Sequence, residues 1–148
     1  DRADFGTATA LLDLVACKTV ARIAEEDGCV GELPQPMSIS AVREVLDGQL
    51  GESPCRQHDA GHLVRRIACV PGAGANTAYL AEALPYGVDL YLTGETSLYL
   101  LEYASFHNVS VLIYSHNYTE IFGTQNLADR IATQLGIRSI FRLQEPHI

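Results

Sequence analysis

His116 and Glu120 are the side chains of this 148-residue sequence whose types and spacing best suit chemistry. They directly follow an apolar segment, residues 109–114, that is typical of a buried strand. If the connection after this strand is helical, the i, i+4 spacing places the imidazole and the carboxylate on one face. A ring nitrogen and one or two carboxylate oxygens could then hold a divalent ion. The alternative is an ordinary solvated start of a helix.

Three further candidates follow two other apolar segments. Glu95 closes the sequence Leu-Thr-Gly-Glu, where its carboxylate could act as a ligand, a base or a helix cap, and the helix dipole favours the cap. Gly72 and Gly74 belong to the turn Pro-Gly-Ala-Gly-Ala-Asn, which resembles an anion-binding nest before a helix. The turn lacks the full P-loop or dinucleotide fingerprint, so anion binding competes with a plain structural turn.

Strands and helices that alternate along the chain must position these residues. We expect strands at 63–70, 88–92, 109–114 and 137–143, and helices at 78–84, 96–107 and 127–135. Short connections and right-handed crossovers then favour an α/β fold with a largely parallel or mixed sheet flanked by helices. Ligands of such sheets sit beyond the carboxyl ends of the strands, which singles out the connections 71–76, 93–97 and 115–123.

The first third of the chain gives weaker signals. A helix is expected at 8–21, a loop rich in Gly and Pro at 27–40, a helix at 41–50 and a polar loop at 49–61. His58, Asp59 and His62 form a second candidate ligand cluster, although nothing in the sequence fixes its geometry. We place a domain boundary near residue 20.

Composition excludes several classes of protein. With 47% hydrophobic and 19% charged residues, the chain can bury a core and is not intrinsically disordered. The net charge of −8 argues against direct nucleic-acid binding and against anionic membranes. The four cysteines include no C-x-x-C pair, so we expect reduced thiols and a cytoplasmic location. The chain opens with Asp1 rather than Met, and a fragment of a longer protein is one interpretation.

Four ordered motifs together resemble the NIF-three-like dinuclear metal-centre family, whose members are also named GTP cyclohydrolase I type 2 homologues. The motifs are G-C-V-G-E-L-P at 28–34, R-I-A-C-V-P-G-A-G-A-N at 66–76, G-V-D-L-Y-L-T-G-E at 87–95 and S-H-N-Y-T-E at 115–120. The resemblance covers nearly the whole chain and matches the second half of a typical member. It implies the family fold without its first part, with residues 1–20 as a remnant of the first domain and 21–148 as an α/β domain that carries the late metal-ligand motif.

The same resemblance implies a metal site. His116 and Glu120 match the family's late G-H-x-x-x-E motif, whose His and Glu are ligands, although Ser115 stands where Gly is usual. Asp1 matches the family's ligand Asp, a carboxylate suited to bridging two ions. The adjacent His-His pair of the family has no counterpart in the sequence. These three residues therefore predict a partial site that binds one ion weakly, or none without the missing segment.

Two departures fall in the family's T-G-D-x-x-x-H stretch. Glu95 replaces Asp, and Tyr99 stands at the His position, which removes an imidazole that could have oriented substrate or water. With Gly72 and Gly74, these residues are the candidates for a substrate rim. No catalytic residue is predicted.

Two functions from different classes follow from the resemblance. The first is a metal-dependent hydrolase of nucleotide-like substrates, with GTP as the implied substrate and zinc, iron, manganese or magnesium as the ion. The second is a non-catalytic metal-binding or scaffold protein that assembles as a homo-oligomer, with a ring as one form. A degenerate homologue is a third interpretation. The expected partners are a small-molecule or nucleotide ligand and further copies of the chain, with neither nucleic acid nor membrane.

Overall fold

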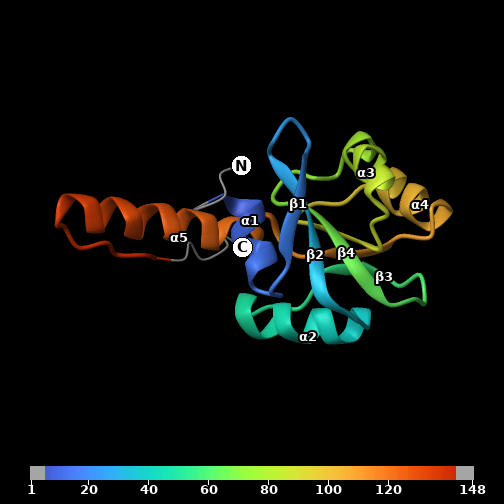
Figure 1. Ribbon diagram of the computed structural model, residues 1–148, viewed down its shortest axis with the longest axis horizontal. Coiled ribbons are helices and arrows are strands. Elements are labelled where there is room, and N and C mark those ends of the chain that lie inside the picture. The colour runs from blue at the N-terminus through green and yellow to red at the C-terminus, as the bar shows by residue number, and fades with distance from the viewer. Residues whose placement is uncertain (1–5, 143–148) are drawn as a thin grey trace.

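A six-stranded sheet forms the framework of the computed structural model, which describes residues 6–142 (Figure 1). Its strands are β1 (Lys18–Ile23), β2 (Gly28–Met37), β3 (Arg56–His58), β4 (Val64–Val70), β5 (Leu90–Thr93) and β6 (Ser110–Ile113). The helices are α1 (Thr7–Asp13), α2 (Ile39–Leu50), α3 (Thr77–Ala83), the 3₁₀ helix η1 (Leu84–Tyr86), α4 (Leu98–Phe106) and α5 (His116–Leu135). The strand order is β1-β2-β4-β5-β6-β3.

The sheet is mixed, as expected from the sequence. Strands β4, β5 and β6 run parallel, because α3 and α4 return the chain between them. Antiparallel pairs extend this parallel centre on both sides, with β2 and then β1 beyond β4, and β3 beyond β6. The parallel strands are buried on both faces, which is why they appear in the sequence as nearly continuous apolar runs.

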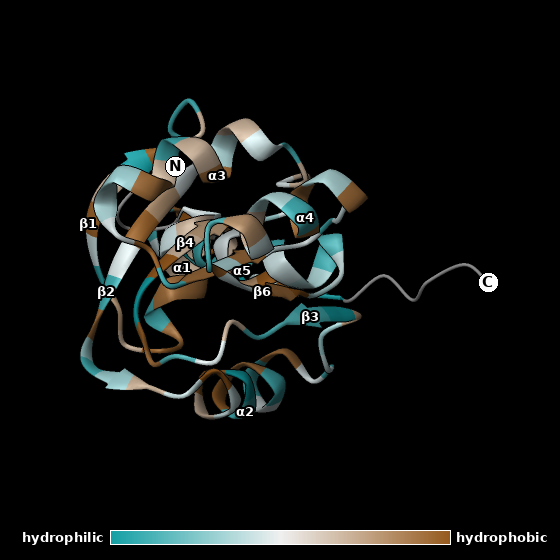
Figure 2. Ribbon diagram, turned by 90° about the vertical axis from the view of Figure 1, so that its right-hand side faces the viewer, coloured by the Kyte–Doolittle hydropathy of each residue, from teal (hydrophilic) through white to brown (hydrophobic). Residues whose placement is uncertain are grey.

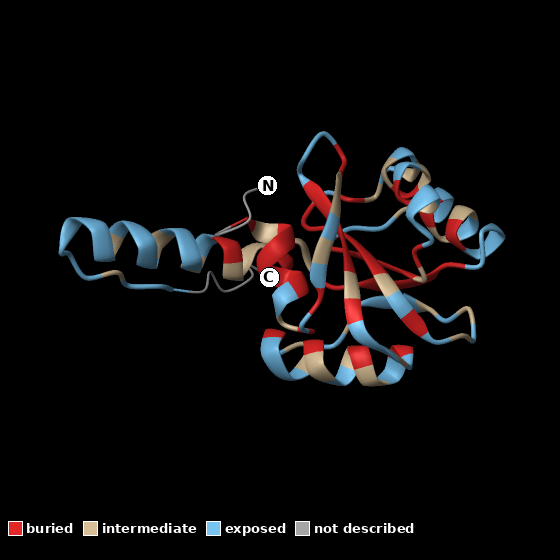
Figure 3. Cartoon of the chain, in the orientation of Figure 1, coloured by how far each residue is buried: buried red, intermediate tan, exposed pale blue. Residues whose placement is uncertain are grey.

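Helices cover both faces of the sheet and divide the core into two layers. Ile67 and Cys69 of β4 pack with α1, α2 and the first turns of α5, whereas Ala68 and Val70 pack with α3 and α4. The buried residues gather in the strands and on the helix faces turned toward them, and the hydropathy colouring follows the same division (Figures 2 and 3). Within the described part, no helix combines the length and the apolar character that a membrane crossing requires.

Two expectations for the first third of the chain are wrong. The helix expected at 8–21 ends at Asp13, and the chain then enters β1, whose residues pair with β2. The passage expected as a loop at 27–40 is mostly strand β2. Pro34 and Pro36 are tolerated there because pairing with β1 stops at Glu32 and pairing with β4 is interrupted between Glu32 and Met37. The short strand β3 lies inside the segment expected to be a polar loop. The domain boundary near residue 20 stays a prediction.

The last part of the chain also differs from expectation. Helix α5 begins at His116 rather than near residue 127, so the connection expected at 115–123 is helical from His116 onward. Residues 137–142 form no strand, and Leu143, the last residue of the expected strand, lies outside the described residues. Gly136 ends α5 in the left-handed conformation, with a φ of 65°, and the chain turns back beside the helix without reaching a partner strand (Figure 1).

His62 joins two loops at the end of the sheet where the parallel strands begin. Its Nε2 lies 2.7 Å from the Asn108 carbonyl oxygen, and its Nδ1 lies 3.2 Å from that of Leu63. Both partners accept hydrogen bonds, so they favour the imidazolium, which donates from both nitrogens. The Asn108 carbonyl is the main cause of the raised pKa of His62, and Asp89 and Asp59 add to it.

The raised pKa makes a small part of the stability depend on pH. Its contribution is fully present below the unfolded pKa of about 6.5 and is lost as the pH rises through the folded value. We expect His62→Gln to lower the free energy of unfolding at pH 5.5 by at most about 1 kcal/mol, because solvent screens the group. Denaturant titrations at pH 5.5 and pH 9 measure this. An equal loss at both pH values would contradict the role of the charge.

Candidate metal centre

The carboxyl ends of β4, β5 and β6 bring three connections together at one edge of the sheet. The Gly72 amide after β4 donates to Thr119 Oγ1 of α5 over 2.9 Å. After β5, a Cβ added to Gly94 would lie 2.8 Å from His116 Cα and 2.9 Å from Gly72 O, closer than side chains tolerate. Glycine at position 94 therefore lets the three connections that the sequence singles out touch one another.

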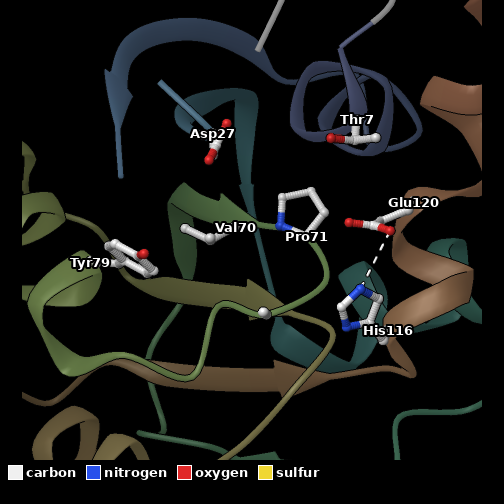
Figure 4. Close-up of a pocket in the computed structure, with 8 residues that line it drawn as sticks. Thr7, Asp27, Val70, Pro71, Tyr79, His116 and Glu120 are labelled. Atoms are coloured by element: carbon white, nitrogen blue, oxygen red, sulfur yellow. Dashed lines mark ion pairs between the residues drawn. The ribbon is translucent and has the colours of Figure 1, made fainter. Parts of the chain in front are cut away.

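His116 and Glu120 lie on the same face of α5, one turn apart. His116 Nε2 is 3.5 Å from Glu120 Oε2, and both side chains are about two-fifths exposed (Figure 4). On the other side of the ring, His116 Nδ1 is 2.7 Å from Glu95 Oε1. A neutral imidazole that donates from Nδ1 to Glu95 keeps the Nε2 lone pair on the side of Glu120. A carboxylate behind a histidine in this way fixes the ring and its tautomer at metal sites.

Gly72 leaves the space in front of this pair open. It has a φ of 60°, which favours glycine, and it is buried against α5. A Cβ at this position would lie 2.5 Å from Glu120 Oε1 and 3.0 Å from His116 Nε2. The turn therefore leaves an open space, termed the cradle, beside Glu120 Oε1 and His116 Nε2. Any larger residue at position 72 would fill this space.

The other candidates from the sequence differ in how they relate to His116 and Glu120. Gly74 is buried, its amide donates to Gly72 O over 3.0 Å, and its carbonyl accepts from the Tyr91 hydroxyl over 2.8 Å. Tyr99, in the first turn of α4, is 79% exposed and does not line the pocket beside His116. Asp1 lies outside the described residues. The rim roles of Glu95, Tyr99, Gly72 and Gly74 stay predictions.

A hollow of about 390 Å³ opens beside His116 and Glu120. The remaining residues that line it are Thr7, Asp27, Val70, Pro71, Ala73 and Tyr79 (Figure 4). Asp27 and Tyr79 were not among the residues expected from the sequence, because neither belongs to a recognisable motif and the fold brings them in from the β1–β2 turn and from α3. Within residues 6–142, no group of three His, Cys, Asp or Glu side chains is arranged to hold a metal ion. The candidate cluster of His58, Asp59 and His62 therefore does not form a metal site. His116 and Glu120 fit a metal ion as two ligands of a larger set.

Glu95→Gln tests whether the carboxylate behind His116 tunes a ligand. The amide keeps the shape of Glu95 but loses the charge that holds Nδ1–H, so Nε2 becomes a poorer and less fixed ligand. We expect the affinity for zinc to fall about 10- to 100-fold, as for comparable partners of metal-bound histidines. Competition with a chromophoric chelator measures the affinity. Unchanged zinc affinity would mean that the contact between Glu95 and His116 does not tune the ligand.

A family model and several known proteins resemble this chain. A family model described as Duf34/NIF3 (NGG1p interacting factor 3) matches residues 1–146. A GTP cyclohydrolase 1 type 2 homolog of Pseudomonas aeruginosa is 34% identical over 113 residues, which are 76% of this chain and 43% of that protein. One of Yersinia pestis is 36% identical over 105 residues, 70% of this chain and 42% of that protein. The chain thus spans less than half the length of these relatives.

Solved structures share the fold. The structure described as protein ybgI of unknown function superposes with a TM-score of 0.86 at 22% identity and covers 99% of this chain and 59% of that chain. The protein TTHA1606 from Thermus thermophilus gives a TM-score of 0.78 at 21% identity, with coverages of 99% and 57%. At these identities the similarity shows the fold alone, and it agrees with the α/β architecture expected from the sequence.

Proposed function

Because the chain belongs to the Duf34/NIF3 (NGG1p interacting factor 3) family, we propose that it contributes His116 and Glu120 to a divalent metal centre of a hydrolase that acts on nucleotide-like substrates. The observation that carries the proposal is the arrangement of three side chains, with His116 between Glu95 at 2.7 Å and Glu120 at 3.5 Å. The open cradle at Gly72 supports the same proposal, since it leaves space at the two ligand atoms.

Each residue of the centre has a distinct task. His116 provides a nitrogen ligand at Nε2, Glu120 provides an oxygen ligand, and Glu95 holds the ring of His116 by its Nδ1–H. A mixed set of one imidazole and carboxylates suits zinc, iron or manganese better than magnesium, which prefers oxygen alone. When bound, such an ion lowers the pKa of a water molecule and polarises the bond that is broken. Asp1, which would add a bridging carboxylate, completes the proposed ligand set of this chain.

The nature of the substrate rests on the relatives. They are named GTP cyclohydrolase 1 type 2 homologs, so GTP is the first substrate to test. We expect the purified chain to bind one zinc or manganese ion weakly in calorimetric titrations, because it holds only part of the ligand set. Chromatography of the products then tests whether the metal-loaded protein consumes GTP. Metal binding without turnover would overturn the hydrolase and keep the metal centre. No binding above that of a His116→Ala variant would overturn both.

A second candidate function, an assembling scaffold, is favoured by the C-terminal part of the structure. Residues 124–142, termed the arm, extend away from the sheet (Figure 1). Leu127, Ile131 and Leu135 form a partly exposed apolar stripe on it, and Ile137 and Ile140 are exposed beyond. The arm carries three arginines and one aspartate, whereas the whole chain has a net charge of −8. These charges favour the acidic body of a second copy as the occupant of the stripe.

Sedimentation velocity tests the assembly. We expect the chain to sediment as a homo-oligomer and Ile131→Glu to shift it toward the 16.1 kDa monomer, since the substitution puts a charge into the apolar stripe. Added salt should weaken the assembly as well. A chain that is monomeric at all concentrations, or an oligomer that Ile131→Glu leaves intact, would contradict this role of the arm.

A further inference from the structure

The hollow beside His116 and Glu120 has a second wall that the metal centre does not use. This wall consists of Asp27, in the turn between β1 and β2, and Tyr79 on α3 (Figure 4). We propose that Asp27 and Tyr79 bind a planar, positively charged or N–H-rich group of the ligand, of the amidine or guanidine type. The proposal rests on the proposed function in that it takes this hollow to be the ligand pocket beside the metal centre.

The position of Asp27 is fixed by the residues on either side of it. Gly28 brings the strand down onto β4, where an added Cβ would lie 2.7 Å from Val70 Cγ2 and 2.8 Å from the Cys69 carbonyl oxygen. On the other side, the Ala24 amide donates to Glu82 Oε2 of α3 over 2.9 Å. These two contacts hold the turn to β4 and α3, the elements that carry Val70 and Tyr79. The backbone at Asp27 is therefore fixed in position in the pocket wall.

The turn also adopts an unusual backbone conformation. Ala24, Glu25 and Glu26 have φ values of 55°, 53° and 74°, in the left-handed region that residues with a Cβ rarely enter. Such conformations are unfavourable and persist only where surrounding contacts enforce them. The hydrogen bond to Glu82 is one contact that enforces this turn.

The chemistry of the wall selects the charge of the ligand. Within residues 6–142, no side chain forms a hydrogen bond or ion pair with the exposed Asp27 carboxylate, so its oxygens are free to accept. Among the described residues that line the hollow, none is Lys or Arg, and Glu120 adds a second acid. At the Asp27 wall of the metal-free hollow an anionic group would therefore be repelled, whereas an amidine offers two N–H donors to one carboxylate.

Tyr79 adds an aromatic surface to this charge preference. The residue is half-buried against the core under α3, and it lines the hollow. The face of an aromatic ring attracts a planar cation through the negative charge of its π-system. The volume of about 390 Å³ lies within the range of small-molecule sites. Asp27 and Tyr79 together thus suit a flat cationic group, with the metal ligands on the opposite wall.

The test uses metal-free protein in EDTA, so that its outcome does not depend on the metal centre. Benzamidine and benzoate are the probes, because they share ring and size but carry opposite charges. In ¹⁵N NMR titrations we expect benzamidine to shift the amides of residues 24–28 and 77–80 and benzoate to leave them unchanged. Asp27→Asn should weaken benzamidine binding at least about fivefold, a loss of roughly 1 kcal/mol. Glu25→Gln, in the same turn but outside the pocket lining, is the matched control and should bind like the wild type.

Tyr79 and zinc provide the remaining controls. Tyr79→Leu should weaken benzamidine binding and Tyr79→Phe should retain it, since only the ring is required. Equal binding of benzoate and benzamidine, or unchanged benzamidine binding by Asp27→Asn, would overturn the proposal. A zinc titration separates the two proposals: if Asp27→Asn loses zinc as His116→Ala does, Asp27 is a metal ligand and the proposal is wrong. A chain that binds benzamidine through Asp27 but no zinc would keep this inference and overturn the metal centre.

Discussion

Replacing His116 with Ala is expected to lower the zinc affinity of the chain by more than about 100-fold. The substitution removes the nitrogen ligand itself, whereas loss of a residue behind a ligand already costs about 10- to 100-fold. Only Glu120 would remain of the two ligand-type side chains that the structure brings together, and a single carboxylate binds zinc poorly. Competition with a chromophoric chelator at neutral pH measures the change.

A second histidine serves as the control for this substitution. His107 follows the last turn of α4, where the centroid of its ring lies 5.1 Å from that of Phe106. It precedes β6 whereas His116 follows it, so the two histidines lie at opposite ends of that strand. We expect His107→Ala to bind zinc like the wild type. The zinc affinity of Glu120→Gln should lie between those of His107→Ala and His116→Ala, because the amide keeps an oxygen but loses the charge. Equal zinc affinities of His107→Ala and His116→Ala would show that binding at His116 is not specific and would contradict the proposed centre.

The centre of the fold could be predicted from sequence because its local signals agree with its final packing. Strands β4, β5 and β6 are buried on both faces, so their apolar runs stand out against the polar connections. The position of His116 and Glu120 after β6 followed from the same reasoning, and their shared helix face needed only the i, i+4 spacing. The sequence left Glu95 as ligand, base or cap, since the 2.7 Å contact with His116 joins two different connections.

The β1–β2 hairpin was missed because distant contacts determine it. The left-handed turn residues Ala24 and Glu25 carry no turn signal of their own, and the pair Asp27-Gly28 that follows them fits a loop as well as a hairpin. Glu82, which holds the turn, lies almost sixty residues away. Pro34 and Pro36 count against a strand locally, yet they lie where the ladder needs no donor. Asp27 was missed for the same reason, since the approach of Gly28 to Val70 brings it to the pocket only in the folded chain.

The contact between α1 and α5 gives a large expected effect on stability. At Gly123 the two helices approach so closely that an added Cβ would lie 2.6 Å from Thr7 Cα and 2.8 Å from Thr7 N. These are backbone atoms, so no rotamer change relieves the overlap, and α1 must move away from α5. Overpacking of this kind costs about 1–3 kcal/mol and occasionally more. In an exposed helix the same substitution would instead stabilise by up to about 1 kcal/mol.

Gly123→Ala is therefore expected to lower the free energy of unfolding by a net 1–2 kcal/mol or so, which corresponds to a fall in Tm of about 2–8 °C. Gly48→Ala is the matched control, because Gly48 lies inside α2 with no atom within 4 Å of an added Cβ. It should raise the stability by about 0.5–1 kcal/mol. Urea titrations and thermal melts of both variants measure the expected loss of stability in Gly123→Ala and the expected gain in Gly48→Ala. Equal effects of the two substitutions would mean that α1 and α5 do not pack as described.

Thr7 also lines the hollow beside Glu120. Displacement of α1 in Gly123→Ala should therefore weaken benzamidine binding, whereas Gly48→Ala should leave it unchanged.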